Sequence, residues 1–477
     1  MFLYKIHLHI LQIEEYELHR FLKWVFKNFF KKTLEGKKKL VWTSKAKQIY
    51  YSAIATAVFL TILLTHLYST WGLTLGIILA SQDYIFLCLG LLYRKPYEII
   101  NRILTRDKTL NTILSYEKLK VIGISGSYAK TSTKDILYNL LKTQYNVLKT
   151  PLSYNNLFGI TKVIEYELDN SYDFFICEMG EYKIGEVDEI ARMVNPLCGI
   201  ITGINEQHLE RFTSLDNTIK AVFELADYIG TKQTDKESLV AINIDNDYIK
   251  SNCDKYNARY LKYGFKSKDY TIKNLKQNID STKFDIILES KTISIKTKPF
   301  LARSHLLNIL AASTLALKLG VSKENIKKAI SNFEASDHRL KVKHLEHKNI
   351  LIDDSYSSNV TGFKEAIHFL KVCGDFDKYN KYKKIIVTPG IVELGKLTAS
   401  IHRELGQLTG EVCDYTILVG KNERTQNLEN GIKQIKNKPY EKKLIYIDSI
   451  KDVWECIIKQ KIDKYIVLFE NDLPDNY

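Results

Sequence analysis

The stretch Val121-Ile-Gly-Ile-Ser-Gly-Ser-Tyr-Ala-Lys-Thr-Ser-Thr133 decides how most of this chain folds. Residues 119–124 predict a short buried strand, and residues 135–141 predict the first turns of a helix. The turn between them places backbone N–H groups and a helix N-terminus where they can hold phosphates. We therefore expect a nucleoside triphosphate site, with Lys130 at the β- and γ-phosphates and the hydroxyl of Thr131 on Mg²⁺.

Alanine stands at position 129, directly before the lysine, where phosphate loops usually carry glycine. If this residue needs a positive φ, alanine costs about 1–2 kcal/mol. We expect Gly126, Ser127 and Ser132 to line the same nucleotide site. The alternative is an ordinary strand, turn and helix with an incidental lysine.

The length and composition indicate a protein of several domains. A chain of 477 residues predicts two to four domains with ample core. Its seven cysteines form no CxxC pair, so their spacing fits neither a disulfide framework nor a zinc cluster and indicates a reducing compartment.

The first half of the N-terminal region is basic, and the second half is apolar. Residues 1–50 hold eleven Lys or Arg against four Asp or Glu, which suits an anionic membrane surface or nucleic acid. Residues 49–68 contain no charged side chain other than histidine and are long enough to span a bilayer, whereas residues 71–93 are nearly as apolar but contain Asp83. Basic residues flank both ends, so we expect a transmembrane hairpin at 49–93 that turns at residues 69–70, with both flanks in the cytoplasm. We expect a membrane partner and no nucleic acid, and Asp83 to pack between the helices.

Two charged segments flank the predicted hairpin. Residues 1–48 include an amphipathic helix around 18–30, which suits either the membrane interface or the core of a small soluble domain. Residues 94–118 are polar, charged and helical, and we interpret them as a linker.

Strands and helices alternate from residue 119 to 336, which predicts an α/β domain with a mostly parallel sheet. The expected strands of this part are 119–124, 172–178, 198–203 and 239–243, and the expected helices are 133–143, 186–194, 215–229, 304–319 and 323–332. A period of two at 259–298 predicts a small antiparallel meander appended to the sheet. Residues 337–477 predict a second α/β domain of the Rossmann type, with strands at 350–353, 384–388, 414–419, 443–447 and 465–469.

Polar residues follow successive strands of the central domain. Glu178 ends the strand at 172–178, and His208 comes just after the next strand. Ligands bind at the carboxyl ends of strands in such sheets, so both side chains are candidates for a metal beside the phosphate loop. Each alone is equally compatible with a strand-end carboxylate or a capped loop histidine.

From about Val121 to the C-terminus the chain resembles the Mur ligase family, in particular its MurF branch. The resemblance rests on several short motifs in the same order along the chain. These motifs are Gly126-Ser-Tyr-Ala-Lys-Thr-Ser-Thr133, Asn155-Asn156, Glu178-Met-Gly180, Asn195-Pro196, His208-Leu-Glu-Arg-Phe212, Asn308-Ile-Leu-Ala-Ala312, His338-Arg339, Asp353-Asp-Ser-Tyr-Ser-Ser-Asn359 and Pro389-Gly-Ile-Val-Glu-Leu-Gly395.

The resemblance implies an ATP-dependent amide ligase. ATP would phosphorylate a carboxylate, and an amine would then attack the acyl phosphate, so cations and N–H donors are needed around crowded negative charge. By this resemblance Glu178 and His208 bind a second Mg²⁺, and Arg339 reaches the γ-phosphate from the C-terminal domain as that domain closes. Asp353 would hold the ribose, and Asn156 and Asn308 would contact the adenine side.

The chain also departs from the family pattern. Besides Ala129, Val222 stands where relatives carry a carbamylated lysine that helps to bind the second metal ion, and Lys220 lies on a different side of the predicted helix. The family's His-Asn pair before Asn308 reads Ser304-His305, and residues 1–118 contain no UDP-binding domain. We expect the ATP site to carry over from the family better than the UDP-linked substrate.

The sequence thus predicts a MurF-like ligase that uses ATP and Mg²⁺ in cell-wall precursor synthesis at the inner face of the bacterial cytoplasmic membrane. Its substrates would be small-molecule or peptide carboxylates and amines. The alternative is a catalytically impaired, ATP-binding membrane scaffold, which Ala129 and Val222 favour. A glutamine-dependent amidating ligase is disfavoured because the sequence has no cysteine-rich zinc ribbon. The sequence does not indicate the oligomeric state.

Overall fold

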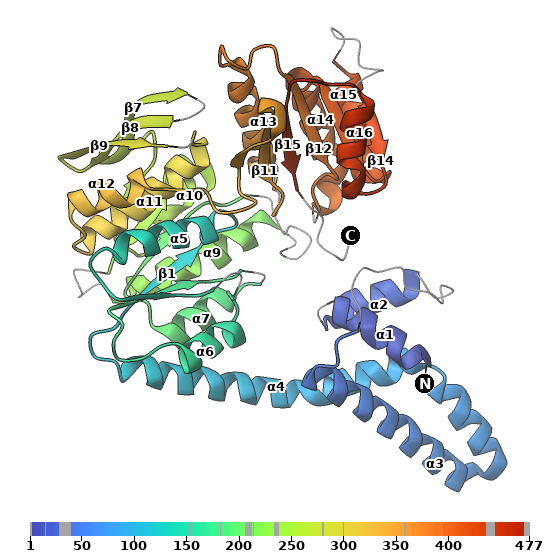
Figure 1. Cartoon of the computed structure of the whole chain (residues 1–477). Helices are drawn as coiled ribbons and strands as arrows, with labels where there is room; N and C mark the ends of the chain where they lie inside the picture. The colour runs from blue at the N-terminus through green and yellow to red at the C-terminus, as the bar shows by residue number, and fades with distance from the viewer. Residues whose placement is uncertain are drawn as a thin grey trace. The chain divides into compact units, whose positions relative to one another are not determined.

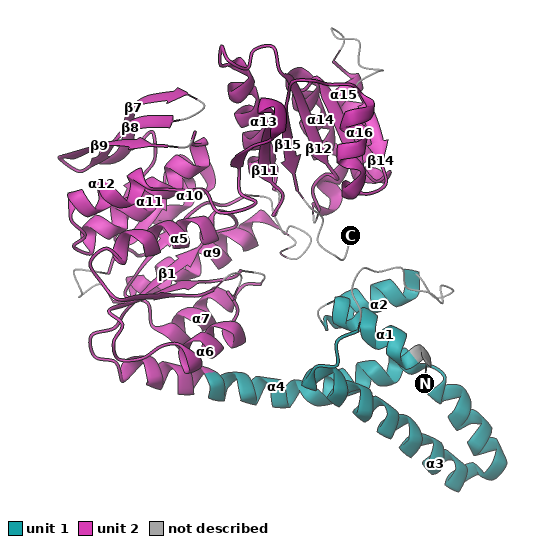
Figure 2. Ribbon diagram, viewed as in Figure 1, with its two compact units in different colours: residues 1–105, 474–477 teal, residues 106–473 magenta. Residues whose placement is uncertain are grey.

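The protein was analysed as a computed structural model. It describes residues 2–14, 16–27, 40–151, 154–181, 183–205, 212, 214–232, 238–278, 281–298, 300–356, 359–392, 394–435 and 444–471. The chain divides into two compact units, Met1–Thr105 and Arg106–Leu473 (Figure 2).

The first unit consists of four helices: α1 (Phe2–Ile13), α2 (Leu18–Lys27), α3 (Ser44–Ala80) and α4 (Asp83–Leu114), of which the last continues into the second unit. Helix α3 reverses direction at Ser69, whose φ of 53° and ψ of −133° are not helical. The turn therefore lies where the sequence predicted it. Helix α3 is the one helix among the described residues that is long and apolar enough to cross a membrane, a criterion based on length and composition alone.

The second apolar segment, predicted at 71–93, is not a single helix, because it is interrupted at Ser81 and Gln82, and a second membrane span there stays a prediction. Asp83 starts α4 and is only 2% exposed, and its carboxylate lies 2.8 Å from Nδ1 of His7 on α1. Asp83 does pack between helices, as expected, but its partner comes from a helix that the sequence did not predict.

Helix α2 contributes its apolar face to the core of the first unit. Phe21 and Val25 are buried together with Leu8 and Leu11 of α1, and the core extends to residues of α3 and α4. Of the two interpretations of this segment, the packing agrees with a core helix. Phe26 of the same helix is 73% exposed, and residues 28–30 of the predicted amphipathic segment lie outside the described residues.

The C-terminal part of α4, from Arg106 onward, belongs to the second unit. Ile113 belongs to the core of that unit, the hydroxyl of Thr109 lies 3.3 Å from that of Thr161, and Lys108 pairs with Glu165. Residues 94–118, predicted as a linker, are helical as far as Leu114.

The central lobe is built on a nine-stranded sheet with the strand order β2-β3-β1-β4-β5-β6-β7-β8-β9 (Figure 1). Strands β2 to β6 run parallel, and β7, β8 and β9 form the predicted antiparallel meander that continues the same sheet. The strands are β1 (Lys120–Ser125), β2 (Val147–Lys149), β3 (Phe174–Glu178), β4 (Cys198–Ile201), β5 (Val240–Asn243), β6 (Tyr260–Tyr263), β7 (Tyr270–Asn278), β8 (Ser281–Leu288) and β9 (Lys291–Thr297).

Helices cover both faces of the parallel part. One core lies under α5 and α11, and the other lies under α6, α7 and α9. The strands between them read as runs of Val, Ile and Phe, because both of their faces are buried. The helices are α5 (Lys130–Leu141), α6 (Leu157–Tyr166), α7 (Glu186–Val194), α9 (Leu215–Gly230), α10 (Asp247–Asn252), α11 (Arg303–Lys318) and α12 (Lys323–Ser331).

The C-terminal lobe has a six-stranded sheet in the order β10-β11-β15-β12-β13-β14, in which only β10 is antiparallel. Its last strand, β15, inserts between the first two parallel strands, β11 and β12. The elements are β10 (Lys341–His344), β11 (Ile350–Asp354), α13 (Val360–Asp375), β12 (Lys383–Thr388), α14 (Thr398–Val412), β13 (Tyr415–Val419), α15 (Glu423–Lys433), β14 (Leu444–Ile447), α16 (Val453–Lys459) and β15 (Tyr465–Glu470).

The start of α11 is tied to the C-terminal lobe. Phe300, just before α11, stacks on Phe369 of α13 with ring centroids 4.6 Å apart. The residue that precedes α11, Ala302, has no capping side chain, and the carboxylate of Glu365 on α13 instead accepts a hydrogen bond from the N–H of Ser304. A carboxylate of the C-terminal lobe therefore caps a helix of the central lobe.

Candidate functional site

The phosphate loop joins β1 to α5 through two residues with unusual backbone angles. Ala129 has φ 65° and ψ 1°, so alanine does occupy a left-handed conformation at the position where glycine was expected. Gly126 has φ +136°, and a Cβ there would lie 2.2 Å from Oγ1 of Thr202. Glycine at 126 is therefore required, whereas alanine at 129 is tolerated at a cost of about 1–2 kcal/mol.

The loop is held against the end of β4. The N–H of Ser127 donates to the carbonyl of Gly203 at 2.8 Å, and the hydroxyl of Thr202 donates to the carbonyl of Tyr128. The ring of Tyr128 packs so closely on Gly203 that a Cβ there would lie 2.2 Å from Cζ. These contacts fix the loop before any ligand arrives.

Lys130 is held between the loop and a carboxylate. Its Nζ donates to the carbonyl of Gly126 and lies 2.8 Å from Oε1 of Glu181. The side chain of Glu181 is only 2% exposed, and that of Lys130 is 13% exposed. An incoming phosphate must therefore share Lys130 with Glu181 or replace it.

Glu178 ends β3 beside the first turn of α5, as predicted. Its Oε1 accepts a hydrogen bond from Oγ1 of Thr131 at 3.2 Å, and its Oε2 lies 2.8 Å from Nζ of Lys134. The side chains of Glu178 and Lys134 are 4% and 1% exposed. This pair is thus buried, with both carboxylate oxygens engaged.

The described residues fit a nucleotide phosphate. Ala129 offers no capping side chain, so the first N–H groups of α5 have no partner within the helix. The hydroxyl of Ser127 is buried and has no hydrogen-bond partner in the described structure, although it lies in the middle of the loop. Both features suit an anion at a helix N-terminus.

Two of the described residues also fit a Mg²⁺ ion. Thr131 and Glu178 supply two neighbouring oxygens of the kind that Mg²⁺ prefers. His208, the other predicted ligand of the second ion, lies outside the described residues. Within the part of the chain that the structure describes, no three His, Cys, Asp or Glu side chains gather as a metal site.

Val222 lies directly beside the loop. It is completely buried on α9, and its carbonyl accepts a hydrogen bond from the hydroxyl of Ser125 at 3.2 Å. Lys220, two residues earlier, is exposed. The exposure of Lys220 agrees with the expectation that this residue does not replace the missing metal ligand. Because Val222 is surrounded by apolar side chains, a lysine at position 222 would be costly to bury.

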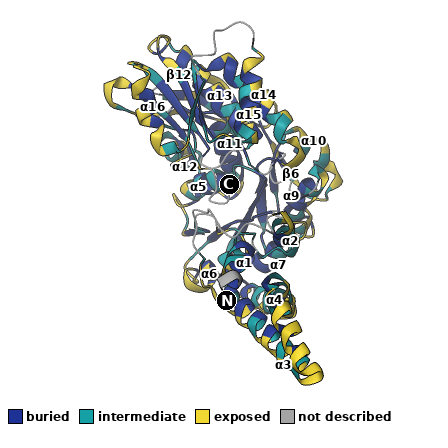
Figure 3. Cartoon of the chain, turned by 90° about the vertical axis from the view of Figure 1, so that its right-hand side faces the viewer, coloured by how far each residue is buried: buried dark blue, intermediate teal, exposed yellow. Residues whose placement is uncertain are grey.

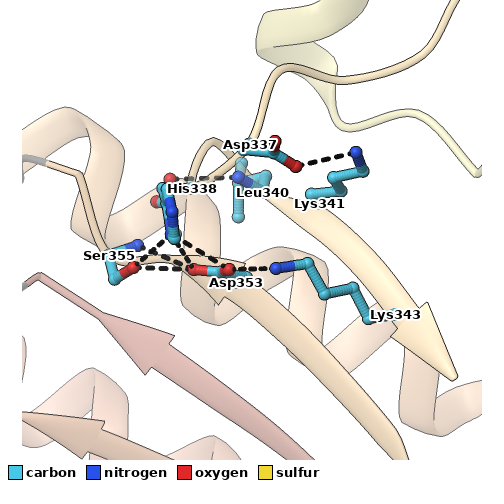
Figure 4. Close-up of polar contacts among 8 residues, drawn as sticks. Asp337, His338, Leu340, Lys341, Lys343, Asp353 and Ser355 are labelled. Carbon is cyan, nitrogen blue, oxygen red and sulfur yellow. Dashed lines mark hydrogen bonds and ion pairs between the residues drawn. The ribbon is translucent and has the colours of Figure 1, made fainter. Parts of the chain in front are cut away.

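A second polar cluster surrounds Asp353 at the end of β11 (Figure 4). One side of the carboxylate faces Ser355 and His338, with 2.7 Å between Oδ1 and Oγ of Ser355, and the other lies 2.7 Å from Nζ of Lys343. Burial opposes ionisation of Asp353, but hydrogen bonds from Lys343, Ser355 and His338 outweigh it and lower the pKa of the carboxyl. Asp353 is therefore a fixed anion with hydrogen-bond acceptors, as recognition of hydroxyl groups requires.

Arg339 belongs to this second cluster and not to the phosphate loop. Its guanidinium lies 4.4 Å from the ring centroid of Tyr356. Its carbonyl is 3.2 Å from Nε2 of His305, whose Nδ1 accepts the N–H of Ala302. His305 is therefore the neutral tautomer with its proton on Nε2, and burial lowers its pKa to about 4.

Three more residues that the sequence predicted to contact the nucleotide lie on helices α5, α6 and α11 or cap them. The side chain of Asn156 caps α6 through the N–H of Gly159, and Asn308 lies on α11 with 7% exposure. Ser132 lies in the first turn of α5. A nucleotide contact at these three positions stays a prediction.

Two residues of the site were missed by the sequence analysis. Lys134 follows Lys130 by four positions on α5, and this spacing places both on one helix face. The spacing was visible in the sequence, but nothing in it indicated that Glu178 was the partner. Glu181 lies three residues beyond Glu178 in a loop, where no periodic pattern exists.

Comparison with known proteins adds a family and a fold. Residues 124–316 match the model of the Mur ligase middle domain. The chain is 29% identical over 304 residues to the UDP-N-acetylmuramoyl-tripeptide--D-alanyl-D-alanine ligase of Bacillus subtilis, a match that covers 63% of this chain and 63% of the relative. The chain therefore spans less than two thirds of that relative's length.

Solved structures share the fold. MurF of Acinetobacter baumannii superposes with a TM-score of 0.66 at 22% identity, over 78% of this chain and 77% of its own. MurF ligase of Thermotoga maritima in complex with ADP gives 0.65 at 21% identity, over 78% and 80%. A pseudomurein peptide ligase type C of Methanothermus fervidus gives 0.56 at 19%, over 75% and 77%.

Proposed function

We propose that this chain, whose residues 124–316 match the Mur ligase middle domain, is a MurF-like, ATP-dependent ligase of cell-envelope precursor synthesis. The observation that carries the proposal is the preformed phosphate loop beside Glu178, with a cation at each of Lys130 and Lys134. Such a site concentrates positive charge and N–H donors where phosphate charge develops.

The proposed reaction has two steps. A substrate carboxylate oxygen attacks the γ-phosphorus of ATP, and ADP leaves. An amine nitrogen then attacks the acyl carbon, loses a proton and displaces phosphate, which keeps one oxygen of the original carboxylate. Mg²⁺ would neutralise phosphate charge at Thr131 and Glu178.

The chain's own residues do the positioning. Lys130 and the N-terminal N–H groups of α5 bind the phosphates and orient them toward the carboxylate. Asp353 offers fixed acceptors for the ribose hydroxyls, and Arg339 completes the phosphate site as the C-terminal lobe closes. His305 positions the backbone of Arg339 for this motion.

A membrane location is part of the proposal. The apolar helix α3 anchors the chain to the bacterial inner membrane, with the ligase lobes in the cytoplasm, where ATP is available. The substrates are a carboxylate and an amine of small-molecule or peptide type at that membrane face.

The proposal is tested by isotope transfer. Full-length protein in lipid nanodiscs is incubated with ATP, Mg²⁺, a UDP-muramoyl tripeptide labelled with ¹⁸O in its terminal carboxylate, and D-alanyl-D-alanine. We expect one ¹⁸O atom in the released phosphate and an amide product by mass spectrometry. A related envelope carboxylate replaces the tripeptide if that substrate is inert, and Lys130→Ala serves as the inactive control.

The second candidate is a nucleotide-binding scaffold. It is favoured by the ion pairs that already occupy Lys130 and Glu178 and by the buried Val222. A scaffold binds ATP but releases no labelled phosphate with any carboxylate and amine.

A further inference from the structure

Large exposed apolar side chains follow one another closely along the far half of the α3 hairpin, and others in the first unit include Phe26 on α2, Tyr51 on α3 and several along α4. Burial on α3 ends at Ala57, apart from the two glycines at 72 and 76. Beyond it lies a set of large apolar side chains that are all exposed: Val58, Phe59, Ile62, Leu63, Leu67, Tyr68, Trp71, Leu73, Leu75, Ile77 and Ile78. In Figure 3 the far end of α3 is largely yellow, the colour of exposed residues.

The two arms of this hairpin pack closely on each other. A Cβ on Gly72 would lie 1.8 Å from the carbonyl oxygen of Leu64, and one on Gly76 would lie 2.8 Å from Thr61. Residues 58–68 and 70–80 are therefore antiparallel arms with small residues at their contact, as in helix pairs within lipid.

One face of the near half of the hairpin is covered by protein, while Tyr51 on the same helix is exposed. Ala46, Ile49, Tyr50 and Ala53 are buried against α1, α2 and the start of α4. The His7–Asp83 pair is buried at this level, and the rings of Phe21 and Trp24 on α2 lie against His7.

Charged side chains surround this covered base. Lys23 and Lys27 lie on the exposed face of α2, and Lys47 and Lys95 are exposed on α3 and α4. Lys45 of α3 and Arg94 of α4 both pair with Glu98 of α4, which ties the start of α3 to α4. The base therefore exposes lysines beside some apolar side chains, whereas residues 58–80 contain no Asp, Glu, Lys or Arg.

We propose that residues 58–80 form a wedge that enters one leaflet of the membrane and does not cross it. Each arm has about 11 residues, or about 16 Å at 1.5 Å per residue, whereas the hydrocarbon core is about 30 Å thick. A complete crossing would draw α2 and the His7–Asp83 pair into hydrocarbon, which is costly for charged groups. The exposed lysines at the base instead meet the anionic headgroups of the leaflet that the wedge enters.

This inference rests on the proposed membrane location and changes its topology. The turn at Ser69 would end inside the bilayer and would not reach the periplasm. The two crossings predicted from the apolar runs would then be one insertion from the cytoplasmic side.

Cysteine labelling tests the depth of the wedge. Thr70→Cys at the turn and Lys47→Cys at the base are treated with a membrane-impermeant maleimide in intact spheroplasts, in inside-out vesicles and in detergent. The unmodified chain corrects for the native cysteines. We expect Lys47→Cys to react in inside-out vesicles, and Thr70→Cys to react only after detergent is added.

The other outcomes separate the two proposals. Reaction of Thr70→Cys from outside intact spheroplasts would show a crossing and overturn the wedge, while the membrane location would stand. Recovery of the chain in the soluble fraction, with Thr70→Cys reactive without detergent, would overturn both.

Quenching of Trp71 gives a second measurement. The full chain is reconstituted in vesicles of phosphatidylethanolamine and phosphatidylglycerol with bromine at shallow or deep acyl positions. The quenching lost on Trp71→Phe isolates this residue, and we expect it to be largest with deep bromine. Largest quenching at the shallow position would place the tip at an interface and contradict the wedge.

Discussion

At the end of β3, two lysines are paired with two almost completely buried carboxylates, whereas at the end of β11 one buried carboxylate is held by partly exposed partners. Lys134 and Glu178 are 1% and 4% exposed, but His338 and Lys343 around Asp353 are 54% and 39% exposed. Solvent screens the second set of charges and hardly reaches the first. Buried ion pairs therefore stabilise the fold of the central lobe, whereas in the C-terminal lobe similar side chains keep the carboxylate of Asp353 ionised.

The largest expected effect comes from breaking the buried pair. Lys134→Met leaves Glu178 without its cation in a dry site, so we expect a loss of about 3 kcal/mol in the free energy of unfolding by urea titration. Lys343→Met removes a partly exposed partner of Asp353 and should cost less than about 1 kcal/mol. Equal losses in the two variants would mean that burial does not distinguish the two clusters.

Next comes nucleotide binding at the loop. Lys130→Ala removes the cation that faces the β- and γ-phosphates, and we expect ATP to bind more weakly by about 2 kcal/mol, roughly thirtyfold, in calorimetry. Lys142→Ala, at the exposed end of the same helix, is the matched control. Unchanged affinity in Lys130→Ala would refute the assignment of the loop.

The C-terminal lobe also provides a pH test. Burial raises the pKa of Asp354 from 3.8 to about 7, against the N–H of Leu340 and the charge of Arg339. Because the pKa of Asp354 is higher in the folded state than in the unfolded state, the contribution of this carboxyl to stability is fully present below about pH 4. It is lost as the pH rises through about 7. We expect Asp354→Asn to remove on the order of 2 kcal/mol of this pH dependence in unfolding curves. Asp337→Asn, whose exposed carboxyl has a lowered pKa, should leave the loss between pH 5 and 8 unchanged.

A smaller effect is expected from the carboxylate that holds Lys130. Glu181→Gln releases the lysine from a charged partner, so ATP should bind more tightly by about 1 kcal/mol. Glu167→Gln, an exposed residue of the same lobe, should change nothing. Weaker binding in Glu181→Gln would show that this carboxylate helps to bind the nucleotide, for example through Mg²⁺.

The smallest effect concerns the backbone of the loop. Ala129→Gly relieves a left-handed alanine but adds flexibility to the unfolded chain, so we expect a gain in unfolding free energy below about 1 kcal/mol. Ala329→Gly, inside helix α12, should have the opposite sign. A loss in both variants would mean that Ala129 carries no strain.

Much of the fold was predictable because its signals are local. The buried strand before the loop, the alternation of strands and helices, and the period of two in the meander each lie in one short window of sequence. Strands β2 and β10 were missed because three or four residues, with lysines among them, carry no clear period. Helix α1 was missed because its role depends on a partner, Asp83, that lies 76 positions away.

Some contacts of the candidate site were predictable from the sequence, and others were not. Lys130, Thr131 and Glu178 come together because parallel strands end at one edge of the sheet, a rule that can be applied to a sequence. The pairing of Lys130 with Glu181 and the stacking of Arg339 on Tyr356 depend on loop conformation, which no short pattern specifies.

The helix cap that the two lobes share offers a reporter of their motion. The N–H of Ser304 donates to Glu365, a carboxylate that belongs to the other lobe. While the lobes keep this contact, that amide is protected from exchange with deuterium, and any rotation that withdraws Glu365 exposes it. The deuterium uptake of a single peptide at the start of α11, followed with and without nucleotide, would therefore report the separation of the two lobes without an attached probe.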